Sequence, residues 1–268
     1  MAEKRPIVTP FARKRFGQHF LEAAWVEKLV RVIDPRPDQT FIEIGPGRGA
    51  LTRPLAARSL GVIAYEIDRD LARALRDEAI PNVTIVEGDF LDQYRVPSTE
   101  HPLLSPPLRV AGNLPYNAAS PILFTLLAMR YAGLPVSDAT VMLQREVADR
   151  LLAEPGTPEY GVLSVLIRHR ADVTRLLNLP AGAFRPPPKV LSSVVQLRFH
   201  DADPPVKDLE RFGQLVRAVF TRRRKTMANA LRALDQGRAK APRWLDGGRR
   251  PETLSVAEFA RLADELTT

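Results

Sequence analysis

The chain has 268 residues, of which 45% are apolar, and its 39 lysines and arginines exceed its 31 acidic residues, which gives a formal net charge of +8. This length suits one large domain or a large and a small one, and a chain without cysteine has no disulfide framework, thiolate zinc site, iron–sulfur cluster or cysteine nucleophile. The apolar runs are too short to span a bilayer and the N-terminus lacks an apolar signal core, so we expect a cytoplasmic protein, with a nucleic acid as the partner that its charge favours.

The first half of the chain alternates short β-branched runs with stretches of helical periodicity. Strands are predicted at residues 40–44, 62–65, 83–86 and 108–111, with helices at 50–59 and 68–78. This alternation is typical of a mainly parallel sheet with helices on both faces. We therefore predict a doubly wound, Rossmann-like α/β fold.

The second half continues the sheet and then becomes helical. Ser120 followed by Pro121 predicts a helix start, with the serine as cap and the proline in the first turn. The further predicted elements are a strand at 139–143, a helix at 160–169 and a strand at 192–199.

A polar, proline-rich stretch at residues 200–205 ends the strand pattern and predicts a domain boundary. The residues after it keep apolar faces at helical spacing, and Ser255 with Glu258 forms a predicted capping box for the last helix. We expect a large domain over residues 1–200 and a small all-helical domain over residues 201–268.

Glycines follow the first predicted strand directly, at Gly45 and Gly47. They allow a tight turn and the close approach of a ligand to the backbone. Together with Ala50 and the later Glu66 they also fit a dinucleotide-binding fingerprint, so this motif alone leaves the ligand open.

Four residues stand just beyond the ends of four successive strands: Gly45, Glu66, Asp89 and Asn113. The carboxyl ends of the strands in a doubly wound sheet line one crevice. Each residue taken alone also fits a simple turn or a helix cap, but the four together predict one binding site.

Residues 113–116, Asn-Leu-Pro-Tyr, resemble the Asn-x-Pro-aromatic motif of adenine N6 methyltransferases, which use S-adenosylmethionine. The whole chain resembles the small-subunit ribosomal RNA adenine dimethyltransferase family (the KsgA group). The resembling segments are residues 16–21, 43–49, 65–66, 88–90, 113–117, 184–190 and 223–226. Nicotinamide enzymes have no reason to carry the motifs at 113–116 and 184–190, so the dinucleotide interpretation falls away.

The resemblance implies an enzyme that transfers methyl groups from S-adenosylmethionine to the N6 amines of two adjacent adenines, in a hairpin loop near the 3′ end of small-subunit ribosomal RNA. It also implies a role in ribosome biogenesis, a 30S-type pre-subunit as partner, a monomer, and no metal. Two alternatives stay open: a large-subunit enzyme that confers antibiotic resistance, and a chiefly non-catalytic assembly or transcription factor.

The implied catalytic residues have a chemical rationale. An exocyclic adenine amine is a poor nucleophile, and hydrogen bonds accepted by the Asn113 side chain and the Leu114 carbonyl would localise its lone pair. Pro115 would fix the backbone, the Tyr116 ring would stack on the base, and the Phe184 ring would cover its other face.

The cofactor would be held mainly by carboxylates. Glu66 would accept hydrogen bonds from both ribose hydroxyls, and Asp89 would accept one from the adenine amine, beside the Phe90 backbone amide. The full cofactor set that we expect is Gln18, His19, Leu21, Glu43, Gly45, Gly47, Glu66, Ile67, Asp89, Phe90 and Asn113.

Two dense basic runs are the expected RNA contacts, and each could also be a solvated face. One belongs to an N-terminal arm and lid over residues 1–20, and the other to a predicted helix of the small domain. The runs are Arg13, Lys14 and Arg15, and Arg222, Arg223, Arg224 and Lys225.

Overall fold

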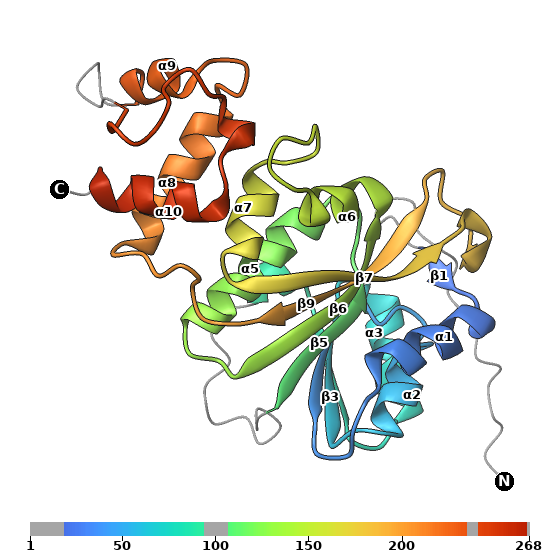
Figure 1. Ribbon diagram of the computed structural model, residues 1–268. Coiled ribbons are helices and arrows are strands. Elements are labelled where there is room, and N and C mark those ends of the chain that lie inside the picture. Colours follow the sequence, from blue (N-terminus) through green and yellow to red (C-terminus); the bar gives the residue numbers. More distant parts are fainter. Residues whose placement is uncertain (1–18, 94–106, 235–240, 267–268) are drawn as a thin grey trace, which may run out of the picture. The chain divides into compact units, whose positions relative to one another are not determined.

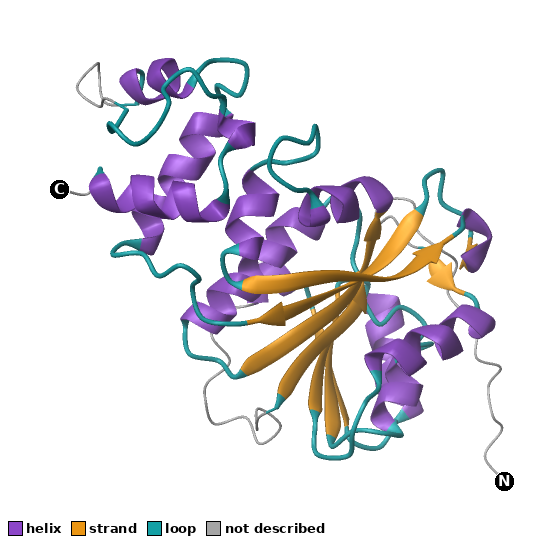
Figure 2. Cartoon of the chain, in the orientation of Figure 1, coloured by secondary structure: helices purple, strands orange, loops and turns teal. Residues whose placement is uncertain are grey.

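The computed structural model describes residues 19–93, 107–234 and 241–266 (Figures 1 and 2). The strands are β1 (Phe20–Leu21), β2 (Thr40–Ile44), β3 (Gly61–Glu66), β4 (Val83–Glu87), β5 (Leu108–Asn113), β6 (Val136–Gln144), β7 (Ala171–Leu179), β8 (Phe184–Arg185) and β9 (Ser192–Phe199). The helices are α1 (Ala23–Ile33), α2 (Thr52–Ala56), α3 (Arg69–Glu78), α4 (Phe90–Gln93), α5 (Ala119–Tyr131), α6 (Arg145–Leu152), α7 (Val162–Arg168), α8 (Leu209–Phe220), α9 (Met227–Arg232) and α10 (Val256–Glu265). Short 3-10 turns lie at η2 (Ala181–Ala183) and η3 (Pro251–Thr253).

A seven-stranded sheet organises the first part of the chain, in the order β4-β3-β2-β5-β6-β9-β7. Strand β2 lies inside the sheet and pairs in parallel with β3 and with β5, while β3 pairs with β4 and β5 with β6 in the same sense. Every residue of β2 is buried, as expected for a strand covered on both faces. The predicted α/β fold with a mainly parallel sheet is confirmed.

Helices cover both faces of this sheet. Val30 and Ile33 of α1 and Leu55 of α2 belong to the same buried cluster as Phe41 of β2, which places α1 and α2 on one face. Figure 1 shows α5 on the other face. Helix α1 was not expected, although Val26, Leu29, Val30 and Ile33 recur at the spacing of one helical face.

The start of α5 differs from the expectation. The helix begins at Ala119, one residue before Ser120, and no side chain caps it. The chain is already turning at this point, because the Ala118 amide donates to the Pro115 carbonyl (2.9 Å). Pro121 is tolerated as the third helical residue because the first four helical amides lack intrahelical acceptors.

The chain divides into two compact units, one over residues 1–145 with 175–196 and the other over 146–174 with 197–268. The second unit therefore includes α6 and α7 in addition to the helices after residue 200. The boundary expected at residue 200 stays a prediction, as does the assignment of separate functions to its two sides.

In the second unit, α8 packs against α7, α9 and α10. The Phe220 ring lies 5.7 Å from that of Phe259 and 6.3 Å from that of Tyr160. The predicted capping box is confirmed: Ser255 Oγ accepts from the Glu258 amide, and the Glu258 carboxylate accepts from the Ser255 amide.

Candidate active site

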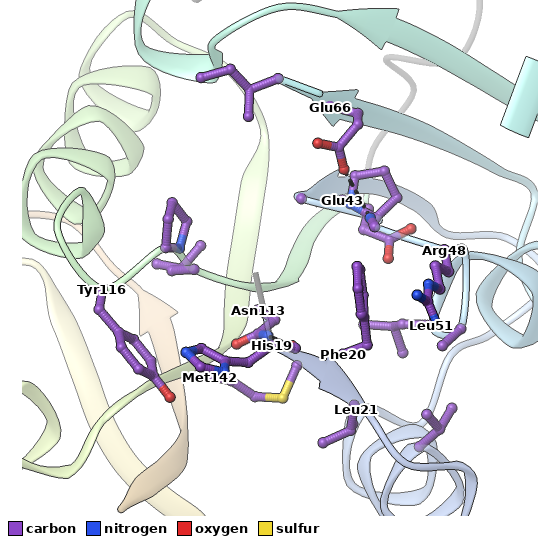
Figure 3. A pocket seen from close by; sticks show the side chains of 18 residues that line it. His19, Phe20, Leu21, Glu43, Arg48, Leu51, Glu66, Asn113, Tyr116 and Met142 are labelled. Atoms are coloured by element: carbon purple, nitrogen blue, oxygen red, sulfur yellow. Dashed lines mark hydrogen bonds between the residues drawn. The ribbon is translucent and has the colours of Figure 1, made fainter. Parts of the chain in front are cut away.

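A pocket opens at the carboxyl ends of β2, β3 and β5 (Figure 3). Its walls come from the residues that follow these strands and from the segment at β1. The lining residues are His19, Phe20, Leu21, Val26, Glu43, Gly45, Pro46, Gly47, Arg48, Ala50, Leu51, Glu66, Ile67, Asn113, Leu114, Pro115, Tyr116 and Met142.

The glycine turn after β2 leaves space in the pocket because its glycines carry no side chains. Gly45 (φ 71°) and Gly47 (φ 59°) both adopt the left-handed conformation that favours glycine. A Cβ atom on Gly47 would lie only 3.1 Å from the Phe20 ring, and one on Gly45 would lie 3.5 Å from the Asn113 carbonyl oxygen. Any side chain at either position would therefore strain the turn and fill space beside the pocket.

Glu66 ends β3 with its carboxylate held by backbone amides. One oxygen accepts from the Gly47 amide (2.9 Å) and the other from the Asp68 amide (2.9 Å). Burial raises the pKa of Glu66, and these two hydrogen bonds oppose the rise. The carboxylate is thus fixed in orientation, with lone pairs left on both oxygens.

Glu43, on β2, lies beside Glu66 in the same pocket (Figure 3). Its side chain is 1% exposed, and Oε2 has no hydrogen-bond partner among the described residues. Burial raises the pKa of Glu43 to about 8, because the charged form loses its hydration there. The Glu66 carboxylate adds to this rise, while Thr52 and Arg53 oppose it.

The Asn113–Tyr116 turn follows β5. The Asn113 side-chain amide donates to the His19 carbonyl (2.8 Å), and the Leu114 amide donates to the Met142 carbonyl (3.2 Å). The Tyr116 hydroxyl shares a hydrogen bond with Ser192 (2.8 Å). These contacts hold the turn from both sides while Asn113 and Tyr116 line the pocket.

The imidazole of His19 covers the Tyr116 ring. The two rings are stacked, with centroids 5.7 Å apart and planes inclined by 26°. His19 Nδ1 lies 2.7 Å from the Pro186 carbonyl oxygen, so the ring also has a partner in the loop after β8. His19 therefore connects β1, the Asn113–Tyr116 turn and that loop.

The structure brings most of the sequence-predicted residues together. Those that line the pocket are His19, Leu21, Glu43, Gly45, Gly47, Glu66, Ile67, Asn113, Leu114, Pro115 and Tyr116. Gln18 lies outside the described residues.

Asp89 and Phe90 do not belong to the pocket lining. Asp89 Oδ1 accepts from the Leu91 amide (2.9 Å) at the start of α4, as a capping side chain does. The Phe90 ring packs edge-on against Tyr65, with centroids 5.3 Å apart. Their predicted contacts with the cofactor stay a prediction.

Phe184 lies elsewhere than expected. Its side chain has no exposed surface and belongs to the buried cluster of α1 and α2, where burial of its apolar ring is favourable. In this conformation the ring has no face for a base to stack on, so the structure does not support the predicted stacking role.

The second basic run lies in the turn between α8 and α9, and not on a helix as expected. Arg222, Arg224 and Lys225 are exposed, whereas Arg223 is partly buried and donates to the Pro158 carbonyl. The first run, Arg13 to Arg15, lies outside the described residues.

Seven lining residues are absent from the predicted site: Phe20, Val26, Pro46, Arg48, Ala50, Leu51 and Met142. Four of them lie within residues 46–51, in or directly after the glycine turn, and the helical spacing of α1 would have indicated Val26. Met142 faces Asn113 across the β5–β6 ladder, a relation that only the strand register reveals. Arg48 lies over the Phe20 ring, with its guanidinium carbon 4.3 Å from the ring centroid.

The described ranges contain no cluster of acidic and histidine residues suited to a metal ion. Within the same ranges, no helix is long and apolar enough to cross a membrane.

Comparison with known proteins gives consistent results. A sequence model of the family described as ribosomal RNA adenine dimethylase matches residues 11–268. A protein of Chromohalobacter salexigens named ribosomal RNA small subunit methyltransferase A is 47% identical over 260 residues, which cover 95% of this chain and 91% of that protein. The protein of the same name from Acinetobacter baylyi is 45% identical, over 95% of this chain and 92% of that one.

Two solved structures resemble the fold. A dimethyladenosine transferase from Plasmodium falciparum has a TM-score of 0.75 at 23% identity, over 93% of this chain and 98% of that one. The 23S ribosomal RNA methyltransferase ErmE has a TM-score of 0.58 at 27% identity, over 93% of this chain and its whole length (100%).

Proposed function

Since this chain belongs to the ribosomal RNA adenine dimethylase family, we propose that its pocket binds S-adenosylmethionine and that it methylates the N6 amines of two adjacent adenines in small-subunit ribosomal RNA. The observation that carries the proposal is a single pocket lined both by Glu66, at the end of β3, and by the Asn113–Tyr116 turn, at the end of β5. The Glu66 carboxylate is suited to binding a ribose, and the Asn113–Tyr116 turn is suited to binding an amino-purine.

The donor side of the pocket fits this cofactor. The Gly47 and Asp68 amides hold the Glu66 carboxylate in orientation, and its two oxygens would accept hydrogen bonds from the ribose hydroxyls. Gly45 and Gly47 leave room for the methionine part, and the exposed side chain of Ile67 offers an apolar surface. When bound, the cofactor supplies a methyl group on a sulfonium, which leaves as a neutral thioether.

The acceptor side prepares the amine for attack. The Asn113 side-chain oxygen and the Leu114 carbonyl would each accept one N6 hydrogen, which draws the nitrogen towards a tetrahedral geometry. The bond from Asn113 Nδ2 to His19 restrains the amide in place, so the enzyme acts largely by orientation. The methylated ammonium is acidic and loses its proton to water.

Tyr116 would stack on the target base, which contributes about 1–3 kcal/mol per base. That gain is comparable with the cost of exposing a base from its own stack. His19 stacks on one face of this ring, so a base that stacks on the same face would displace the imidazole.

The exposed residues Arg222, Arg224 and Lys225 would contact RNA phosphates, together with Arg13, Lys14 and Arg15. We assign RNA binding to the helical domain of residues 201–268. The substrate would be a 30S-type pre-subunit in the cytoplasm, bound by a monomeric enzyme.

The test is to incubate the protein with a labelled methyl donor and isolated small subunits, large subunits or naked RNA, and then to map the label. We expect it on two adjacent adenines of small-subunit RNA. The Asn113→Ala variant is the control for methylation by a contaminant. Label confined to large-subunit RNA would refute the assignment, and it would favour the activity that the name of ErmE describes.

A further inference from the structure

Glu43 is a buried acid that the proposed transfer step does not use. It occupies the fourth position of strand β2 and lines the pocket directly below the glycine turn. Its side chain is 1% exposed, yet Oε2 has no hydrogen-bond partner among the described residues. The Thr52 hydroxyl and Arg53 favour the charged form of Glu43, but they do not offset the loss of hydration, so a carboxylate in this place is costly.

The charged groups around Glu43 do not compensate for that loss of hydration. Glu66, from β3, has the same charge. Arg53, from α2, is the cation that acts on Glu43, but its guanidinium is bound to the Glu78 carboxylate through two hydrogen bonds of 2.6 Å. His19 and Arg48 also line the pocket, and the guanidinium of Arg48 lies over the Phe20 ring.

We propose that Glu43 carries a proton when no cofactor is bound, and that it releases this proton when the ammonium group of the cofactor's methionine part binds beside it. This inference rests on the proposed function, because it takes the ligand to be an amino-acid thioether or sulfonium of adenosine. The methionine part belongs at the Gly45–Gly47 turn, where the backbone leaves room and where Glu43 lies.

The step is balanced without a further reactant. The O–H bond of the Glu43 carboxyl breaks, its proton goes to the buffer, and the carboxylate pairs with an ammonium group that stays protonated. The raised pKa of Glu43, about 8, means that the acid is mostly protonated at pH 7 before binding. Cofactor binding should therefore tighten as the pH rises from 6 to 8, by up to about tenfold per pH unit.

The test is titration calorimetry at pH 7 in two buffers with different ionisation enthalpies, which gives the number of protons released on binding. S-Adenosylhomocysteine keeps the ammonium group, whereas 5′-methylthioadenosine shares its thioether and adenosine but lacks the amino-acid part and with it the ammonium group. We expect release of close to one proton with the first ligand and none with the second. The Glu43→Gln variant should bind S-adenosylhomocysteine without proton release.

Three results would overturn the inference: no release with the wild-type protein, equal release with both ligands, or unchanged release in the variant. The affinity of the wild-type protein between pH 6 and pH 8 gives a second measurement that does not depend on any variant folding, and a flat profile would also overturn it. If neither ligand binds the folded wild-type protein, the proposed function fails with it, whereas binding without proton release refutes only the role of Glu43.

Discussion

Buried ionisable side chains are paired with each other at one end of the seven-stranded sheet, whereas at the other end they lack a partner of opposite charge in the described part of the chain. Towards the amino end of β5, Arg109 is 6% exposed and forms two hydrogen bonds with Asp138 of β6 (2.8 and 3.1 Å) and a third with Gln39 (3.0 Å). At the carboxyl ends of β2 and β3, Glu43 and Glu66 lie together in one pocket, and one oxygen of Glu43 has no partner among the described residues.

The pair at the first end stabilises the fold, whereas the two acids at the second end are suited to binding a ligand. A buried ion pair in good geometry stabilises the arrangement that satisfies it, and breaking it leaves an uncompensated charge. Two acids with raised pKa values in one pocket instead indicate a binding site, where a ligand supplies the hydrogen bonds or the positive charge that the protein does not. Substitutions at the two ends should therefore change different properties of the protein.

The largest effect should come from breaking the paired end. Arg109→Met leaves the partly buried carboxylate of Asp138 without its cation and should lower the free energy of unfolding by about 3 kcal/mol. Urea denaturation measures the loss. The double variant Arg109→Met with Asp138→Leu removes both charges and should recover most of it, so equal losses in the single and double variants would contradict this account.

At the pocket end, Asn113→Ala should impair the reaction and leave the fold intact. The lost acceptor matters most as the amine attacks, so the single-turnover rate should fall by about 10²–10³-fold. Cofactor affinity, measured by calorimetry, and the urea midpoint should stay near those of the parent. A near-normal single-turnover rate would remove Asn113 from the catalytic role.

Replacing the unpartnered acid should stabilise the protein. The pKa of Glu43 is about 8 in the native state against an ordinary value of 4.5, so the native state holds its proton while the unfolded chain loses it. Stability should therefore fall as the pH rises from 4.5 to 8, and Glu43→Gln should abolish this decline. At pH 7 the gain is about 3 kcal/mol. Urea denaturation between pH 5 and pH 8 tests this, and parallel profiles for parent and variant would contradict it.

The smallest effect on the protein itself should come from neutralising the exposed basic residues, which lie outside the sheet. Replacing Arg222, Arg224 and Lys225 by Gln should weaken RNA binding and lower its log–log salt slope by about 0.7–0.9 per lost contact. Their side chains are exposed, so the urea midpoint and cofactor affinity should not change. An RNA titration across salt concentrations measures the slope, and an unchanged slope would assign the run to a solvated face.

The sequence predicted β2 at its observed bounds, Thr40–Ile44, because a strand buried on both faces is rich in apolar and β-branched residues, and four of these five residues are of those types. It predicted most of the pocket, because residues at the ends of parallel strands share one edge. It could not indicate Met142, whose place depends on the β5–β6 register, or the burial of Phe184, because a motif does not state which side of its loop faces the core.

The hydrogen bond from Asn113 Nδ2 to the His19 carbonyl also has a bearing on which bases the enzyme accepts. It turns the NH2 group of that side chain towards His19, which leaves the amide oxygen for a base, beside the carbonyl oxygen of Leu114. A pair of acceptors suits the amino group of adenine and leaves the keto oxygen of guanine or hypoxanthine without a partner, which is costly in a buried site. Deamination of a target adenosine to inosine should therefore prevent methylation at that position, even though the shape of the base hardly changes.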